Sequence, residues 1–347
     1  MKSLSILTLA TLLFIVGCSK ENNPVTPPQQ TAKGMYILNE GNFNRANSTL
    51  TLFYPDSNRT YDNVYESVNG KKLGDTGNSI TLFQDRAYIV MNGSNKIEVI
   101  NAETQKWIAT IACPAGASPR HIVIASESKA YISNLYDNSV SIVDLKNYSI
   151  TGKISVGANP EEMLLAGAKL YVTNSGFGKG RTISIIDVAT DQVKSTLTVG
   201  DNPIHIRKIN DAQAVALCGG DYGDFNDPND DTPGKIFFIS LTTASITDSL
   251  LIGGHPFEMA IDGAKNLYTI GSEGVIKINL ISKTIVSTKF ITGNLYTIAY
   301  DAKRDRLLVT DPKDYLQPGT VNIYTMNGTL QSSFTAGVNP GWIAFAE

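Results

Sequence analysis

The sequence predicts an all-β protein folded as a seven-bladed β-propeller. Three observations support this prediction. A repeat of about forty residues, a length typical of propeller blades, runs through residues 34–347. Each copy reads as four short strands, and no segment keeps a helical period. A parallel β-helix would need shorter repeats, and a sandwich would not repeat its turn residues in this way.

Each full copy opens on a proline turn, continues into a strand that ends in Asn, and then gives a β-branched strand. One copy has the turn 158–160, the strand 170–174 and the strand 182–187. Short apolar or alternating runs bounded by Gly, Asn, Asp and Pro are strand signals. The prolines that mark the period are Pro119, Pro160, Pro203, Pro256 and Pro340.

The first copy is incomplete, and the C-terminus supplies what it lacks. Residues 35–39 and 48–53 read as strands, but no strand after a proline turn precedes them. The apolar run 342–346 follows Pro340 and has no later strands to pair with. We therefore expect this run to be the inner strand of the first blade, which closes the ring without a long exposed edge. Counted in this way, the chain has seven blades.

The N-terminal residues predict a lipoprotein signal peptide over residues 1–17. Lys2 precedes an uncharged apolar run, 4–16, that is too short to span a membrane, and Gly17 and Cys18 follow it. We expect lipidation at Cys18, followed by a polar, proline-containing tether up to residue 33. The alternative is an ordinary signal peptide with a cysteine there by chance. Lys20 and Glu21 resemble the charged export tags of surface lipoproteins of Bacteroidota, which favours an outer-membrane location facing the cell exterior.

Composition excludes some partners and covalent features. The formal net charge is −3, without a basic stripe, which argues against nucleic-acid binding. Cys113 and Cys218 lie in strand-like runs, where we expect buried small hydrophobic residues rather than a disulfide framework.

The insertions of the repeat predict a ligand-binding face. In a propeller, the loops between second and third strands share one face with the loops that enter the next blade. The longest segments are of the first kind and carry aromatic and polar residues, which suit a large polar ligand. They are residues 39–47, 134–138, 174–180, 219–234 and 311–319. With the blade-entry turns, they give a predicted ligand set of Phe43, Asn92, Arg120, Tyr136, Glu161, Asn174, Phe177, His205, Tyr222, Phe257, Tyr296, Tyr315 and Trp342.

Other interpretations of these residues stay open. The Asn that recurs at strand ends also suits turns, where its side chain binds nearby backbone. Asp221, Asp224 and Asp227 are candidate Ca²⁺ ligands in an acidic loop without the EF-hand spacing, and a solvated loop is the alternative. The three histidines do not form a zinc motif, and no catalytic motif is present. We therefore expect a non-catalytic protein that requires no cofactor, with a propeller hydrolase or lactonase as the less favoured alternative.

The repeated strand Tyr171-Val-Thr-Asn174 resembles the YVTN or YncE-type propellers over nearly all of residues 34–347. The segments 39–43, 47–53 and 220–223 are similar to surface propellers of Bacteroidota, among them the BtuG-type cobalamin-binding proteins. This resemblance implies capture of cobalamin or a related corrinoid and its transfer to a TonB-dependent, BtuB-like outer-membrane transporter. Siderophore capture and a non-catalytic interaction scaffold are the alternatives, and the negative net charge favours a neutral corrinoid over an anionic ferric siderophore.

Overall fold

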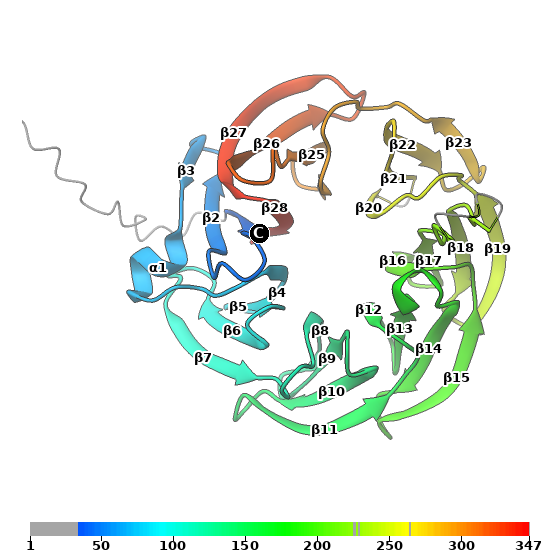
Figure 1. Cartoon of the computed structure of the whole chain (residues 1–347), viewed down its shortest axis with the longest axis horizontal. Helices are drawn as coiled ribbons and strands as arrows, with labels where there is room; N and C mark the ends of the chain where they lie inside the picture. Colours follow the sequence, from blue (N-terminus) through cyan, green and yellow to red (C-terminus); the bar gives the residue numbers. More distant parts are fainter. Residues whose placement is uncertain (1–33, 225–226, 228–229, 264, 347) are drawn as a thin grey trace, which may run out of the picture.

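A computed structural model describes residues 34–224, 227, 230–263 and 265–346 of the chain. The predicted signal peptide, Cys18 and the tether lie outside these residues. Seven four-stranded antiparallel sheets form a ring of blades, which confirms the predicted fold (Figure 1). No helix in the described ranges is long and apolar enough to cross a membrane.

Blades are numbered along the chain, and the strands of each blade follow one another from the centre of the ring outward. Blade 1 consists of β28 (Pro340–Phe345), β1 (Met35–Asn39), β2 (Thr49–Tyr54) and β3 (Arg59–Tyr61). Blade 2 consists of β4 (Gly77–Phe83), β5 (Arg86–Met91), β6 (Lys96–Asn101) and β7 (Trp107–Ala112). Blade 3 consists of β8 (Pro119–Ser126), β9 (Lys129–Asn134), β10 (Ser139–Asp144) and β11 (Ser149–Ser155).

The remaining four blades repeat this arrangement. Blade 4 consists of β12 (Pro160–Ala166), β13 (Lys169–Asn174), β14 (Thr182–Asp187) and β15 (Gln192–Thr198). Blade 5 consists of β16 (Pro203–Asn210), β17 (Gln213–Cys218), β18 (Lys235–Ser240) and β19 (Ser245–Leu251). Blade 6 consists of β20 (Glu258–Asp262), β21 (Asn266–Gly271), β22 (Gly274–Asn279) and β23 (Thr284–Ser287). Blade 7 consists of β24 (Ile298–Asp301), β25 (Arg306–Asp311), β26 (Pro318–Thr325) and β27 (Leu330–Val338).

The ring closes through the C-terminal strand, as the sequence predicts. Strand β28 pairs antiparallel with β1, with Trp342 opposite Leu38 and Ala344 opposite Tyr36. The first and last parts of the described chain therefore share one sheet. Unfolding of either end opens the ring, since blade 1 has no other inner strand in the described chain.

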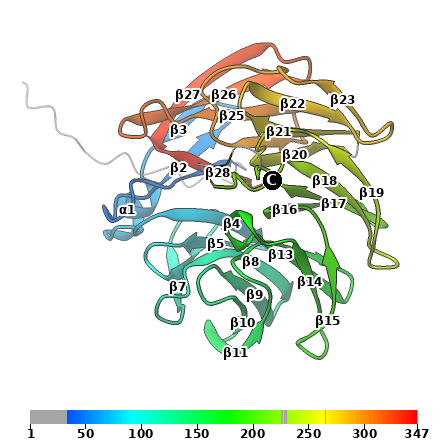
Figure 2. The ribbon, with the colours of Figure 1, turned by 45° about the vertical axis from the view of Figure 1, so that its right-hand side comes forward.

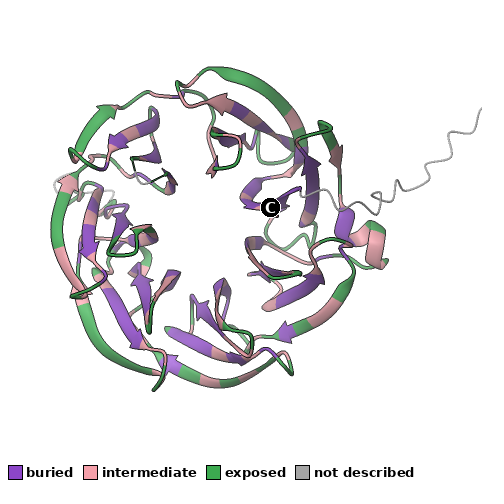
Figure 3. Ribbon diagram, turned by 180° about the vertical axis from the view of Figure 1, so that it is seen from behind, coloured by how far each residue is buried: buried purple, intermediate pink, exposed green. Residues whose placement is uncertain are grey.

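The core lies between neighbouring blades, because each sheet buries both of its faces against the next. Figure 3 shows buried residues on the inner and middle strands and exposed residues on the outer strands. A tyrosine on the second strand is fully buried in five blades, where its ring fills the space between sheets. These tyrosines are Tyr36, Tyr88, Tyr131, Tyr171 and Tyr268. Cys218 is buried and Cys113 is half-buried, and neither forms a disulfide.

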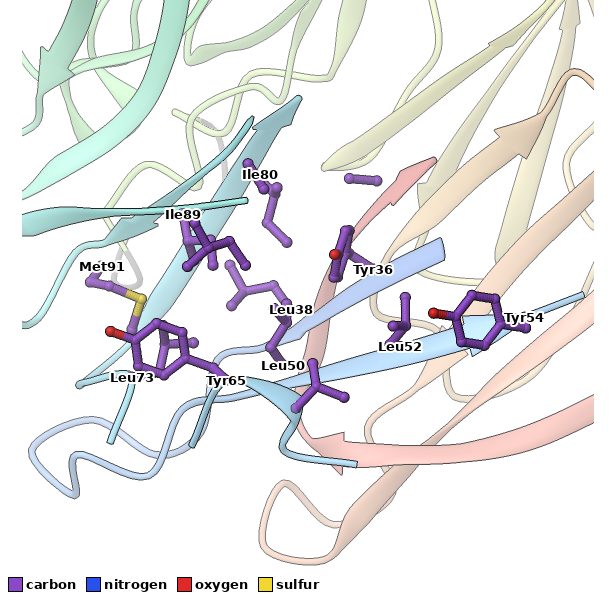
Figure 4. Close-up of a cluster of buried hydrophobic side chains, with 14 residues drawn as sticks. Tyr36, Leu38, Leu50, Leu52, Tyr54, Tyr65, Leu73, Ile80, Ile89 and Met91 are labelled. Carbon is purple, nitrogen blue, oxygen red and sulfur yellow. The ribbon is translucent and has the colours of Figure 1, made fainter. Parts of the chain in front are cut away.

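One short helix, α1 (Val64–Asn69), is added to the all-β architecture. It follows the three-residue outer strand β3 and buries Val64 and Tyr65 in the cluster between blades 1 and 2 (Figure 4). Its six residues make fewer than two turns, too few for a helical period to be visible in the sequence. A second short element, the 3₁₀ turn η1 (Gly176–Gly178), lies in a loop of blade 4.

Candidate functional site

The five predicted insertions connect the second and third strands of their blades. They join β1 to β2, β9 to β10, β13 to β14, β17 to β18, and β25 to β26. Two further long segments, 62–76 and 288–297, lead into blades 2 and 7. We call the surface formed by these loops and the blade-entry turns the loop face. Its members come from blades that are distant in sequence, and closure of the ring brings them together.

Contacts between neighbouring loops show that they share one face. The rings of Tyr136 and Phe177, from blades 3 and 4, lie 5.7 Å apart. Tyr222 of blade 5 stacks on His255, in the turn that enters blade 6, at 3.6 Å. On the other side of the ring, the Asn42 side chain of blade 1 donates to the backbone oxygen of a blade 7 loop residue at 2.7 Å.

Large aromatic side chains protrude from this face into solvent. Such exposure costs free energy that burial would recover, and it is typical of surfaces that bind a ligand or partner. The exposed fractions are 72% for Phe43, 63% for Tyr136, 60% for Phe177, 60% for Tyr222, 47% for Tyr315 and 39% for Phe257. The structure therefore brings these six predicted residues together on one exposed surface.

Two of these aromatic residues have unfavourable backbone conformations. Phe177 has φ 51° and Tyr315 has φ 63°, in the left-handed region that bulky residues seldom adopt. Tyr315 also packs edge-on against Tyr296, with ring centroids 5.8 Å apart. Strained residues of this kind gather at binding surfaces, where the strain presents a side chain.

Nearer the centre than the exposed aromatic residues, charged side chains of neighbouring inner strands pair with one another. We call this set of charged residues the charged ring, and its first pair is Arg120 and Glu161. The guanidinium of Arg120, on β8, donates from Nε to Glu161 Oε2 on β12 at 2.6 Å. Its Nη1 donates to Asn78 on β4. Burial alone would lower the pKa of Arg120, but Glu161 and further carboxylates raise it. Arg120 therefore stays charged and links three blades.

A second group of charges continues the ring through blades 4, 5 and 6. Glu162 of β12 pairs with Arg207 of β16 and accepts a hydrogen bond from the Ile206 amide at 2.9 Å. His205 Nδ1 lies 3.3 Å from Glu162, and its Nε2 lies 3.7 Å from Glu258 of β20. Burial raises the pKa of Glu258, which favours its neutral form there.

Glu40 and Tyr296 complete the ring between blades 1 and 7. Glu40 follows β1 directly, and its Oε2 accepts a hydrogen bond from the Tyr296 hydroxyl at 2.8 Å. Burial raises the pKa of Glu40 to about 7, although the Tyr296 hydrogen bond and Arg120 both act to lower it. Glu40 therefore changes charge near neutral pH.

Trp342 lies within this ring rather than on the exposed rim. Its indole is half-buried, donates to the backbone oxygen of Ile80 at 3.1 Å, and has its ring 5.4 Å from His121. Burial lowers the pKa of His121 well below its usual value, so this imidazole is neutral. Trp342 thus joins blade 1 to blades 2 and 3.

The two predicted asparagines have structural hydrogen bonds. Asn174 is 1% exposed and donates to the hydroxyls of Thr182 and Ser184, at 3.1 and 3.0 Å, in the neighbouring strand. Asn92 donates to the backbone oxygen of Pro119 in the next blade at 3.1 Å. These contacts agree with the alternative interpretation, in which the repeated Asn has a structural role at strand ends. Asn174 exposes almost no surface that a ligand could contact.

The acidic loop does not form a metal centre in its described part. Across the described ranges, no group of three or more His, Cys, Asp or Glu side chains could hold a metal ion. Asp221 instead accepts from the Gly223 amide at 3.2 Å, and Asp230 accepts from the Asp224 amide at 2.9 Å. The Ca²⁺ candidates Asp221, Asp224 and Asp227 therefore do not gather as a site.

Sequence reasoning missed four members of the charged ring. They follow a turn or a strand end closely, as Arg120 and Glu161 do directly after their turn prolines, and that spacing was the signal available. A turn proline two or four residues earlier marks three of them, and Asn39 marks the fourth. The four are Glu40, Glu162, Arg207 and Glu258.

Comparison with known proteins agrees with this architecture. A family model described as "Domain of unknown function (DUF5074)" matches residues 33–218. Among curated proteins, "Antigen Lp49" of Leptospira interrogans serogroup Icterohaemorrhagiae serovar copenhageni is 28% identical over 148 residues, which cover 39% of this chain. The match covers 32% of the antigen, so the chain spans about a third of the length of this relative.

Two solved structures share the fold at low identity. A quinonprotein alcohol dehydrogenase-like protein from Bacteroides thetaiotaomicron has a TM-score of 0.69 at 15% identity, with 91% of this chain and 79% of that chain covered. Hydrazine synthase of Kuenenia stuttgartiensis has a TM-score of 0.60 at 17% identity, with 77% and 88% covered. At these identities the likeness shows the propeller fold alone.

Proposed function

We propose that this chain, which belongs to the DUF5074 family, is a lipid-anchored, cell-surface protein that captures cobalamin or a related corrinoid on its loop face. The ligand then passes to a TonB-dependent, BtuB-like transporter in the outer membrane. The observation that carries this proposal is the set of exposed aromatic rings around one face, surrounding a recessed ring of charged and amide groups. The similarity of residues 39–43 and 220–223 to BtuG-type propellers supplies the ligand class.

The shape and chemistry of the face suit a broad ligand with many polar edges. A corrin ring presents apolar faces and amide side chains, so it can pack against Phe43, Phe177 or Tyr222 while its amides reach polar groups nearer the centre. Exposed rings at 60–72% offer large contact areas with few rotatable bonds to order. This arrangement favours a large, flat, polar ligand over a small buried substrate.

Charge pairing favours a ligand with little net charge over a ferric siderophore. A catecholate siderophore is strongly anionic once it holds iron and calls for several uncompensated cations. Arg120 and Arg207, the arginines of the central ring, are each paired with a glutamate. Neither is an unpaired cation, so the ring lacks the several uncompensated cations that such a siderophore calls for.

The proposal is tested with soluble protein that lacks residues 1–18 and cyanocobalamin. The mixture is passed through a desalting column, and the absorbance of the void volume is measured. We expect the red ligand to elute with the protein. Ferric enterobactin in the same experiment tests siderophore capture, and no retention of cyanocobalamin at micromolar concentrations would overturn the corrinoid proposal.

A matched pair of variants locates the site. The triple substitution Phe43→Ala, Phe177→Ala and Tyr222→Ala removes exposed rings from the loop face, and we expect at least a tenfold loss of affinity, since each lost contact is worth about 1 kcal/mol or more. The control Ile281→Ala, Val286→Ala and Leu330→Ala removes side chains that are equally exposed but away from the loop face. Equal affinity of both triple variants would move the site elsewhere.

A further inference from the structure

A cavity of about 280 Å³ lies among the inner strands of blades 5, 6, 7 and 1. Strands β16, β20 and β28, which contribute to its walls, are the inner strands of their blades and border the centre of the ring (Figures 1 and 2). The lining begins at Glu258 and continues to Ile261 and Tyr300, toward the strand ends remote from the loop face. The cavity therefore begins at the charged ring, where it shares Arg207, Glu258 and Trp342 with the centre of the loop face, and it extends away from the exposed aromatic rings. We call it the channel cavity.

Arg207 gives the channel cavity an incompletely matched positive charge. Within the described part of the chain, Arg207 makes one ion pair, with Glu162. The same carboxylate also accepts a hydrogen bond from the Ile206 amide and contacts His205. A guanidinium has five N–H donors, and the Arg207 side chain lines the cavity with 30% of its surface exposed. Burial lowers the pKa of Arg207 to about 10, as expected where nearby groups do not fully compensate the charge.

The rest of the lining combines aromatic and aliphatic side chains with Lys208, whose ammonium pairs with Asp211. The Arg207 guanidinium carbon lies 5.9 Å from the centre of the Trp342 ring, which forms a wall of the cavity. The Thr297 hydroxyl, at the same end, donates to Glu258 at 3.0 Å. The aliphatic lining consists of Met259, Ala260, Ile261, Ile298, Ala299 and Ile343. The cavity therefore offers the Arg207 cation beside apolar contact, and its second cation, Lys208, is already paired.

The inner strands add a second kind of polar partner. Strands β16, β20 and β24 each pair with one neighbour in their sheets, so among the described residues their other edges face the channel. Such edges carry backbone amide donors that are otherwise left to water. A bound anion can therefore receive hydrogen bonds from the guanidinium and from strand edges.

We propose that the channel cavity is a second binding site, which takes a small organic carboxylate with an apolar body. The carboxylate pairs with Arg207, and the body lies against Trp342 and the aliphatic wall. A doubly charged oxyanion is disfavoured, because Glu162 stands beside Arg207 and the other lining cation, Lys208, is paired with Asp211. The volume is close to the lower end, about 300 Å³, of ordinary ligand pockets, which suits an anion of the size of benzoate.

The two tryptophans of the chain provide a direct reporter. Trp107→Phe leaves Trp342 as the sole tryptophan, placed in the wall of the cavity. Benzoate and inorganic phosphate are titrated separately into this variant, with tryptophan fluorescence and calorimetry as readouts. We expect a saturable change with benzoate and none with phosphate.

Two independent changes test the geometry. Arg207→Gln combined with Glu162→Gln removes the cation without leaving a buried lone carboxylate, and Ala299→Phe fills the cavity without touching the ion pair. Each is expected to weaken benzoate binding at least tenfold in the Trp107→Phe background. Arg181→Gln, which removes an arginine paired with Asp201 on the surface, is the matched control and is expected to leave the affinity unchanged.

The outcomes separate this site from the loop face. Ala299→Phe is expected to retain cyanocobalamin on the desalting column as well as the parent protein does. The proposal is overturned if benzoate gives no saturable signal, or if affinity survives both the double substitution and Ala299→Phe. Tighter binding of phosphate than of benzoate would overturn the assignment of a carboxylate.

Discussion

Glu161 of blade 4 accepts a hydrogen bond from Arg120 of blade 3 at 2.6 Å, and its neighbour Glu162 pairs with Arg207 of blade 5. Two adjacent residues of one inner strand therefore hold the blades on either side. Successive side chains of a strand point in opposite directions, which is why two consecutive glutamates reach opposite neighbours. The start of β12 acts as a link between three blades.

This linkage predicts coupling between Arg120 and Glu161. Removing one partner leaves the other charge partly buried, so Glu161→Gln and Arg120→Met are each expected to lower the free energy of unfolding by about 1–3 kcal/mol. The double variant should lose less than the two single losses together. Urea unfolding of all four proteins measures the coupling, and strict additivity would show that the pair acts independently.

Glu40 predicts a stability change near neutral pH. Its pKa in the folded protein is raised from 4.5 to about 7, so folding favours the protonated form. The contribution of this group is fully present below pH 4.5 and is lost as the pH rises through about 7. The full effect is at most about 3 kcal/mol.

Glu40→Gln isolates that effect. The amide oxygen can still accept the Tyr296 hydrogen bond, but the group no longer titrates. We expect the variant to unfold at higher urea concentration than the parent at pH 8, with a smaller difference at pH 5. A pH profile identical to that of the parent would show that Glu40 does not titrate in this range.

The repeated structure was predictable from the sequence because it depends on local patterns. Tyr171 and Asn174 stand at fixed places in a strand, and the same strand recurs in other blades. The proline turns mark where each inner strand begins. The closure through Trp342 also followed, since the first repeat lacked one strand and the last residues supplied it.

The centre of the ring was less predictable, because its geometry depends on how separate blades face one another. Glu258 and Thr297 belong to different repeats, and nothing in either segment alone indicates their hydrogen bond. Asn174 was predicted as a ligand contact, but its register opposite Thr182 directs it into its own sheet. The local sequence pattern therefore predicts that a strand forms, but the direction of its side chains depends on how that strand pairs with its neighbours.

Asn174 predicts a loss of stability without a loss of function. Asn174→Ala removes two buried hydrogen bonds and leaves two hydroxyls short of a partner, so we expect unfolding to become easier by about 1–3 kcal/mol. The control Asn147→Ala removes an exposed contact with Asp144 and should change stability by less than about 0.5 kcal/mol. Thermal unfolding compares the two. Cyanocobalamin binding should be unchanged in both, and a weaker affinity in Asn174→Ala alone would return this residue to the ligand set.

Phe177 predicts opposite effects on stability and binding. Its φ of 51° is unfavourable for a bulky side chain and ordinary for glycine, so Phe177→Gly should relieve strain and stabilise the fold by up to about 1 kcal/mol. The same change removes a ring that is 60% exposed and contributes little to the core. The cost of losing the ring should appear in ligand binding, as at least a threefold loss of affinity for cyanocobalamin, or about 0.7 kcal/mol.

The control for Phe177→Gly is Ala244→Gly, which has φ 52° in the turn between β18 and β19, away from the loop face. It should leave binding unchanged, so a loss of affinity there would point to a general effect of the backbone. If Phe177→Gly instead destabilises the protein and binds the ligand normally, the ring belongs to the structure of the loop, and the strained conformation has no role in presenting it.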